Sequence, residues 1–182
     1  MPPTTILITG PPGCGKTTLV AELRAHGYQA ADTDDLSTVV HWIDDQGREA
    51  ARPSPTTTDW LRKHHFVWRR DGLRAWMAEQ AKPIFLCGLA ENMFDCLDLF
   101  DRAYYLQLPD ATSMERLSRG ERTNPLGKDL RQRQLALAMK RTLDRRAHEE
   151  SLIQLDATAE PVAIVETLLV GLALPEPVDT RV

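Results

Sequence analysis

A glycine-rich stretch near the start of the chain holds the residues best suited to chemistry. Gly10, Gly15, Lys16 and Thr17 occupy the four fixed positions of the phosphate-loop (Walker A) pattern G-x-x-x-x-G-K-[ST]. Glycines let the backbone curl so that several N–H groups point at phosphate oxygens. The Lys16 ammonium supplies a point charge for the outer phosphates, and the Thr17 hydroxyl can ligate Mg²⁺. The loop predicts a bound nucleoside triphosphate in contact with Gly10, Pro11, Pro12, Gly13, Cys14, Gly15, Lys16, Thr17 and Thr18.

The residues on either side of this loop form the context that phosphate binding needs. Residues 4–9 are a short, β-branched and apolar run, typical of a strand. Residues 17–26 have the pattern of a helix that Gly27 ends. This order places the phosphates at a helix N-terminus, which attracts anions. A glycine-rich turn without a ligand is the alternative, and the flanking elements argue against it.

Two aspartates follow a predicted second strand, residues 28–31. Asp32 and Asp34 alternate along an extended strand end, so both can face one cleft. With Thr17, Asp32 is our candidate for holding Mg²⁺. Asp34 is our candidate for orienting an attacking hydroxyl. The alternative is a helix cap at Asp35 with the other two aspartates merely solvated.

The third predicted strand, residues 84–87, ends at Gly88. A glycine lets its backbone N–H approach a substrate closely. Asn92 follows shortly afterwards, and we take both residues as candidate contacts to a phosphoryl acceptor. The strand has no acidic residue directly at its end, so Thr17 and Asp32 carry the metal assignment.

Positive charge is concentrated in one part of an acidic chain. Residues 116–146 contain ten Lys/Arg and three Asp/Glu (+7), whereas the rest contains twelve and twenty-three (−11), for a net charge of −4. This block suits a polyphosphate-binding lid, which we place at 119–128, with Arg122 acting on the transferred group. Arg116 can stack on adenine, and Arg141 can reach the phosphates or an anionic acceptor. A solvated charged helix is the alternative for the part of the block that follows the lid.

Predicted strands and helices alternate along the whole chain. This alternation predicts a three-layer α/β/α domain with a five-stranded parallel sheet, whose ligands bind at the carboxyl ends of the strands. A long helix at 59–82 is expected, with Trp60, Trp68 and Trp76 in an apolar stripe. We expect one domain, 1–182, with a helical acceptor-binding segment at 36–82 and a loose tail at 175–182. The other expected elements are strands at 103–108 and 152–155 and helices at 91–99, 110–119, 129–150 and 160–172.

The composition of the chain limits its class. A length of 182 residues is enough for one domain with a sizeable core. We find no apolar run of the roughly 20 residues that a membrane span needs. The three cysteines are odd in number and unevenly spaced, which indicates reduced thiols and a cytoplasmic protein. The negative net charge argues against general nucleic-acid binding. The sequence does not indicate the oligomeric state.

Taken together, these residues resemble the small P-loop kinases of the nucleoside monophosphate kinase and shikimate kinase group. The chain looks most similar to bacterial "shikimate kinase-like" or AAA-type ATP-binding proteins. The resemblance covers nearly the whole chain and rests on residues 10–18, the D-x-D of Asp32 and Asp34, Gly88 and the stretch 116–128. It implies ATP with Mg²⁺ as phosphoryl donor, a lid arginine at Arg122 and an adenine-packing arginine at Arg116. It also implies that Asp32 and Asp34 of the D-x-D pair help to hold Mg²⁺ and to position the acceptor hydroxyl.

Residues 155–158 add to the resemblance, since they are similar to the loop that wraps adenine in this group and so imply contacts from Asp156 and Thr158. Two features depart from shikimate kinases. The third strand is followed by Gly-Leu-Ala-Glu-Asn and not by a glycine triplet. The arginine that grips the shikimate carboxylate has no clear counterpart, although Arg62, Arg69 and Arg70 are candidates. Shikimate is therefore not the expected substrate.

Three functions fit the sequence. The first is an ATP-dependent small-molecule kinase acting on a hydroxylated or phosphorylated metabolite such as a nucleoside, nucleotide or sugar. The second is a P-loop ATPase or switch that acts on a macromolecule, and the third is a polynucleotide 5′-kinase. The arginine-bearing lid and the D-x-D pair favour the small-molecule kinase, because they suit in-line transfer to a positioned hydroxyl.

Overall fold

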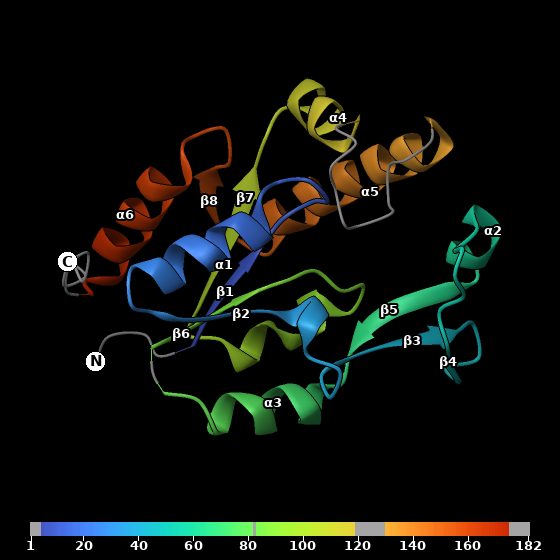
Figure 1. Ribbon diagram of the computed structural model, residues 1–182, viewed down its shortest axis with the longest axis horizontal. Coiled ribbons are helices and arrows are strands. Elements are labelled where there is room, and N and C mark those ends of the chain that lie inside the picture. Colours follow the sequence, from blue (N-terminus) through green and yellow to red (C-terminus); the bar gives the residue numbers. More distant parts are fainter. Residues whose placement is uncertain (1–4, 82, 119–129, 175–182) are drawn as a thin grey trace.

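A five-stranded parallel sheet forms the centre of the molecule. The computed structural model describes residues 5–81, 83–118 and 130–174. In this sheet β1 (Thr5–Thr9) lies between β6 (Ile84–Cys87) and β7 (Arg102–Gln107), and β2 (Gln29–Asp32) and β8 (Ile153–Asp156) form the edges. The strand order β2-β6-β1-β7-β8 brings the first strand of the chain to the middle (Figure 1). The predicted fold class is confirmed.

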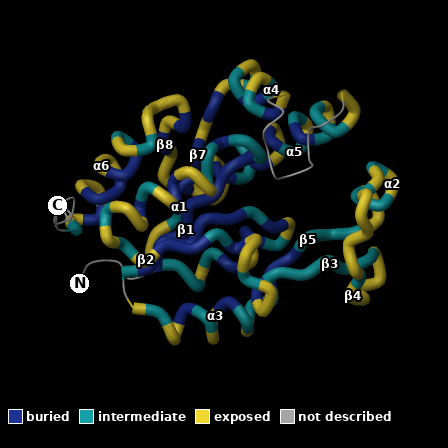
Figure 2. The backbone as a smooth tube through the Cα atoms, in the orientation of Figure 1, coloured by how far each residue is buried: buried dark blue, intermediate teal, exposed yellow. Residues whose placement is uncertain are grey.

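Helices cover both faces of this sheet. On one face α1 (Lys16–Ala25) and α6 (Pro161–Leu172) pack against Ile6 and Ile8 of β1. On the other face α3 (Arg70–Ala78), α5 (Leu130–Glu149) and the 3₁₀ helix Met93–Leu99 pack with Leu7. This alternation follows from the strand geometry, in which successive side chains point to opposite faces. All five β1 residues are buried, as expected of a central parallel strand (Figure 2).

A second, smaller sheet replaces most of the predicted helical acceptor segment. The strands β3 (Val40–Asp44), β4 (Glu49–Ala50) and β5 (His64–Trp68) form it in the antiparallel order β4-β3-β5. Between β4 and β5 lies the one-turn helix α2 (Thr58–Leu61). In Figure 1 this sheet projects from the main body on the side away from α6.

The predicted helix at 59–82 is therefore wrong, although α3 forms its second half. Residues 64–68 are aromatic or β-branched, and their full register with β3, from Val40 opposite Trp68 to Asp44 opposite His64, outweighs the helical spacing. The tryptophan stripe is divided as a result. Trp68 is buried in the main core, whereas Trp60 packs with Trp42 of the small sheet.

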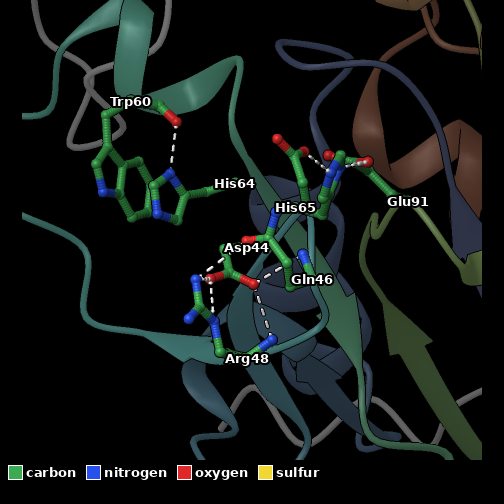
Figure 3. A network of polar contacts seen from close by, with 8 residues as sticks. Asp44, Gln46, Arg48, Trp60, His64, His65 and Glu91 are labelled. Atoms are coloured by element: carbon green, nitrogen blue, oxygen red, sulfur yellow. Dashed lines mark hydrogen bonds and ion pairs between the residues drawn. The ribbon is translucent and has the colours of Figure 1, made fainter.

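Asp44 closes the turn between β3 and β4. Its carboxylate accepts hydrogen bonds from the backbone N–H groups of Gln46 and Arg48, both at 2.9 Å, and from Arg48 Nε at 2.7 Å (Figure 3). The Arg48 hydrogen bonds hold the pKa of the Asp44 carboxyl below its usual range. The Asp44 carboxylate thus stabilises the turn of this hairpin.

The other predicted elements are present, with ends shifted by two residues or fewer. They include α4 (Asp110–Ser118), which packs on α5. The predicted lid at 119–128, with Arg122, and the predicted tail at 175–182 lie outside the described residues. Within the ranges that the structure describes, the helices are too short or too polar to cross a membrane.

Candidate active site

The phosphate loop connects the end of β1 to the first turn of α1. Gly15 caps this helix with φ +102°, a left-handed conformation that favours glycine, and it has no side chain with which to cap the first N–H groups. These N–H groups are therefore free of a side-chain cap at a helix end, a position that favours anion binding. Lys16 Nζ donates hydrogen bonds to the carbonyls of Gly10 at 2.7 Å and Pro11 at 3.1 Å, so its ammonium lies within the curl of the loop.

The two predicted aspartates lie beside this loop at the end of β2. Thr17 Oγ1 donates to Asp32 Oδ2 at 2.9 Å, which joins the loop to the edge strand. Asp32 also caps a 3₁₀ turn by accepting from the Asp34 backbone N–H at 3.1 Å. Burial, followed by the negative charge of Asp32, raises the pKa of the Asp34 carboxyl. Both carboxylates line the cleft described next.

One cleft, with a volume of about 1220 Å³, runs from the phosphate loop to the small sheet. Its nucleotide end is lined by residues 12–19, Arg116 and Thr158. Arg116 Nη1 donates to the Cys14 carbonyl at 3.4 Å. Its opposite end is lined by Trp42, Arg52, Leu61, Arg62, His64, His65, Phe66, Leu89, Ala90, Glu91, Phe94 and Arg146.

Asp156 and Thr158 form a closed turn after β8. The backbone N–H and the hydroxyl of Thr158 donate to Asp156 Oδ1 at 2.8 and 2.6 Å. These hydrogen bonds lower the pKa of the Asp156 carboxyl. Thr158 lies in the cleft lining, while Asp156 shapes the turn from outside the lining.

Two predicted acceptor contacts have other partners. A Cβ added at Gly88 would lie 1.9 Å from Thr33 Oγ1, so the missing side chain makes room for Thr33. The Asn92 amide accepts from the Trp68 N–H at 2.8 Å and donates to the Trp68 carbonyl at 2.9 Å. Neither residue lines the cleft.

The third such contact, Arg141, also lies outside the cleft lining, and its Nε donates to Asp110 Oδ2 at 3.1 Å. Five residues further along α5, Arg146 does line the cleft, with its guanidinium 4.2 Å from the centre of the Phe94 ring. To predict which of these two arginines faces the cleft, one must know how α5 is rotated about its axis. The sequence of a mostly polar helix does not show this rotation.

Sequence reasoning missed His65, one of two histidines in the cleft lining. His65 Nδ1 lies 2.6 Å from Glu91 Oε2 (Figure 3). On the other side of the ring, His65 Nε2 lies 3.1 Å from Asp45 Oδ1. The Glu91 hydrogen bond, followed by that of Asp45, raises the pKa of the His65 imidazole. The imidazole bridges three separate segments, so no local sequence signal identifies it.

Comparisons with known proteins agree with this fold. A family model described as an AAA domain matches residues 6–137. No curated protein matches the chain. Among solved structures, a shikimate kinase from Acinetobacter baumannii in complex with shikimate is 16% identical, with a TM-score of 0.59 and coverage of 93% of each chain.

Two further solved structures are similar. A gluconokinase from Sinorhizobium meliloti 1021 is 17% identical over 94% of this chain and 92% of its own, with a TM-score of 0.53. A deoxyadenosine kinase from M. mycoides with bound dATP is 13% identical over 93% of this chain and 99% of its own, with a TM-score of 0.50. At these identities the likeness shows a shared fold, and it confirms the resemblance to small P-loop kinases at that level.

Proposed function

The chain belongs to the AAA domain family, and from that premise we propose that it transfers the terminal phosphoryl group of ATP to a small hydroxylated or phosphorylated metabolite. One observation carries the proposal. A single cleft contains Lys16, the Thr17–Asp32 pair and Asp34, and it continues beyond them to a separate wall on the small sheet. An ATPase needs room for a water molecule, whereas this cleft has space for a second substrate.

The residues at the end of β2 fit a magnesium ion. Mg²⁺ prefers oxygen ligands and retains several waters, so it needs few protein groups. Thr17 and Asp32 offer a hydroxyl and a carboxylate already 2.9 Å apart, and in our proposal they hold the ion. When bound, Mg²⁺ neutralises charge on the phosphates.

Asp34 is the group that we assign to the acceptor. Its carboxylate lines the cleft next to Asp32, and its raised pKa makes it a better proton acceptor than an exposed aspartate. We propose that it orients the attacking hydroxyl and takes its proton as the new bond to phosphorus forms. Lys16 and Arg116 hold the donor, and Arg122 of the predicted lid remains in the proposal on sequence grounds alone.

The test is ADP formation measured with and without candidate acceptors. We expect Asp34→Asn to lower acceptor-dependent turnover by about 10²–10⁴-fold, the usual contribution of a positioned base, with little change in ATP affinity. Lys16→Ala is expected to abolish turnover. Glu79→Gln, which removes a carboxylate outside the cleft lining, is the control and is expected to behave like the parent.

Two results would contradict the proposal. ADP formation at one rate, with or without acceptors, indicates an ATPase. Turnover by Asp34→Asn at the parent rate removes the acceptor-positioning role. Turnover is also expected to depend on Mg²⁺. Chelation with EDTA should stop ADP formation, and added Mg²⁺ should restore it.

A further inference from the structure

Aromatic side chains of the small sheet form a wall at the acceptor end of the cleft. Trp42 on β3 stands directly opposite Phe66 on β5 in the strand register, and their ring centres are 5.0 Å apart. Trp60 adds a third ring, 4.9 Å from Trp42. All three rings are partly exposed, and Trp42 and Phe66 line the cleft. In the described part of the chain, the buried residues of the two cores do not include them.

This aromatic wall is fastened to the ligand-binding edge of the parallel sheet. The Glu91 backbone N–H donates to the Phe66 carbonyl at 2.9 Å. The Asn92 amide holds both backbone groups of Trp68, two residues further along β5. Since Glu91 and Asn92 follow β6, these bonds place Phe66 at the edge where the strands end. Asp34 lines the same cleft.

The charge on the wall limits the kind of acceptor. The Arg52 guanidinium lies 5.5 Å from the centre of the Trp42 ring, and its positive charge also acts on Asp34. A cationic acceptor is disfavoured, because this ring already has a cation over its face. Leu61, Leu89 and Ala90 line the same region. Because Arg62, His65 and Glu91 also line this region and can bond hydroxyl groups, the preference for a ring over a ring-free polyol rests on the partly exposed aromatic rings.

Resting on the proposed function, we infer that the acceptor is a planar ring without positive charge that bears an alcohol arm. Its ring packs on Phe66 and Trp42, and its arm extends to Asp34. Nucleosides and pyridine-type alcohols have this chemistry. Aromatic side chains accept such rings with little preference among them, because every planar ring has a π face.

The experiment compares rings with ring-free polyols on the full chain. Binding of adenosine, thymidine and pyridoxine is measured by calorimetry with saturating ADP and Mg²⁺, so that the nucleotide end is filled. Ribose and gluconate are the ring-free probes. Acceptor-dependent ADP formation from ATP is then measured with the same five compounds.

Phe66→Leu removes the ring face and keeps an apolar side chain in β5. We expect this variant to raise the Kd and KM of a ring acceptor about tenfold, within the range for one stacked base, and to leave the KM for ATP unchanged. Phe100→Leu is the matched control, since Phe100 packs near Trp68 and lies outside the cleft lining. It is expected to bind ring compounds like the parent.

The outcomes separate this inference from the proposed function. The inference is overturned if none of the ring compounds binds, if ribose binds as tightly as adenosine, or if Phe66→Leu binds like the parent. Turnover with gluconate alone would overturn it and leave the kinase standing. Ring binding that Phe66→Leu weakens, without any acceptor-dependent ADP formation, would support the ring site and reject the kinase.

Discussion

Replacing Lys140 with methionine tests how the two helices beside the predicted lid are joined. The Lys140 side chain is only 4% exposed, and its Nζ lies 2.9 Å from Asp110 Oδ1 and 2.6 Å from Asp144 Oδ2. The buried Tyr105 hydroxyl donates to the second carboxylate at 2.6 Å. Asp110 begins α4, whereas Lys140 and Asp144 lie on α5. The ammonium therefore ties α4 to α5 through one network.

The size of the effect follows from the exposure of the partners. Breaking a fully buried ion pair costs about 3–5 kcal/mol. Here the carboxylates of Asp110 and Asp144 are 41% and 29% exposed, so water can solvate them once the ammonium is gone. We therefore expect Lys140→Met to lower the free energy of unfolding by about 2 kcal/mol. For a chain of this length, that corresponds to a fall in Tm of about 4–8 °C.

Thermal unfolding by circular dichroism at neutral pH is the assay. Arg141→Met is the matched control, because Arg141 pairs with the same Asp110 but its side chain is 68% exposed. We expect that control to lose less than about 1 kcal/mol, as is usual for a surface pair. An unchanged Tm for Lys140→Met, or an equal loss for Arg141→Met, would refute the reasoning.

The pH dependence gives the same prediction a second measurement. The hydrogen bond from Lys140 is the main reason why the pKa of the Asp110 carboxyl lies below its ordinary value of 3.8. Partial burial acts in the opposite direction, and the hydrogen bond from Arg141 lowers this pKa further. A depressed folded-state pKa contributes stability that is present above the unfolded pKa and lost as the pH falls through the folded one. The difference in Tm between the parent and Lys140→Met is therefore expected to shrink as the pH falls below about 4.

Two other substitutions test the small sheet and the end of β6. Because the pKa of His65 is raised above 6.5, its bridge stabilises the fold below about pH 6.5 and stops doing so as the pH rises through the folded value. The parent is expected to lose its stability advantage over His65→Gln between pH 6 and pH 9, measured by denaturant unfolding; a constant difference would exclude the bridge. Gly88→Ala places a Cβ 1.9 Å from Thr33 Oγ1 and should cost about 1–3 kcal/mol. Adding Thr33→Ala should recover part of that loss, and no recovery would place the clash elsewhere.

The sequence was sufficient for the central sheet and for the strand and helix on either side of the phosphate loop. Continuous apolar runs such as residues 84–87 are typical of strands buried on both faces, and a parallel sheet brings their ends to one edge. The phosphate loop is a local feature, since its pattern lies within residues 10–17 and the strand and helix that flank it are adjacent in the sequence. In a parallel sheet, ligands bind at the carboxyl ends of the strands, which predicts that Asp32 and Asp34 lie beside the loop. In the structure both line the cleft.

The opposite end of the cleft was harder to predict from the sequence, because its structure depends on pairing between distant residues. Val40 and Trp68 stand opposite each other in the strand register although 28 residues separate them along the chain, and the short strand that contains Trp68 also fits a helical spacing. Local patterns cannot decide between the two when tertiary pairing supplies the difference in free energy. His65 could not be found for the same reason, since its carboxylate partners come from a hairpin turn and from the loop after β6.

Asn92 shows how a correctly placed residue can act by a different route from the one expected. Sequence position puts it after β6, where we expected a substrate contact, but its amide oxygen and nitrogen bond to the two backbone groups of Trp68. By holding β5 at that point, it sets the distance between Phe66 and the ends of the parallel strands. In our proposal, phosphate binding depends on a short local loop, whereas the ring of the acceptor packs on a separate sheet held by hydrogen bonds from residues 91 and 92. Because the aromatic wall and the phosphate loop belong to separate elements, we expect that substitutions in the wall can alter the acceptor without disturbing the phosphate loop.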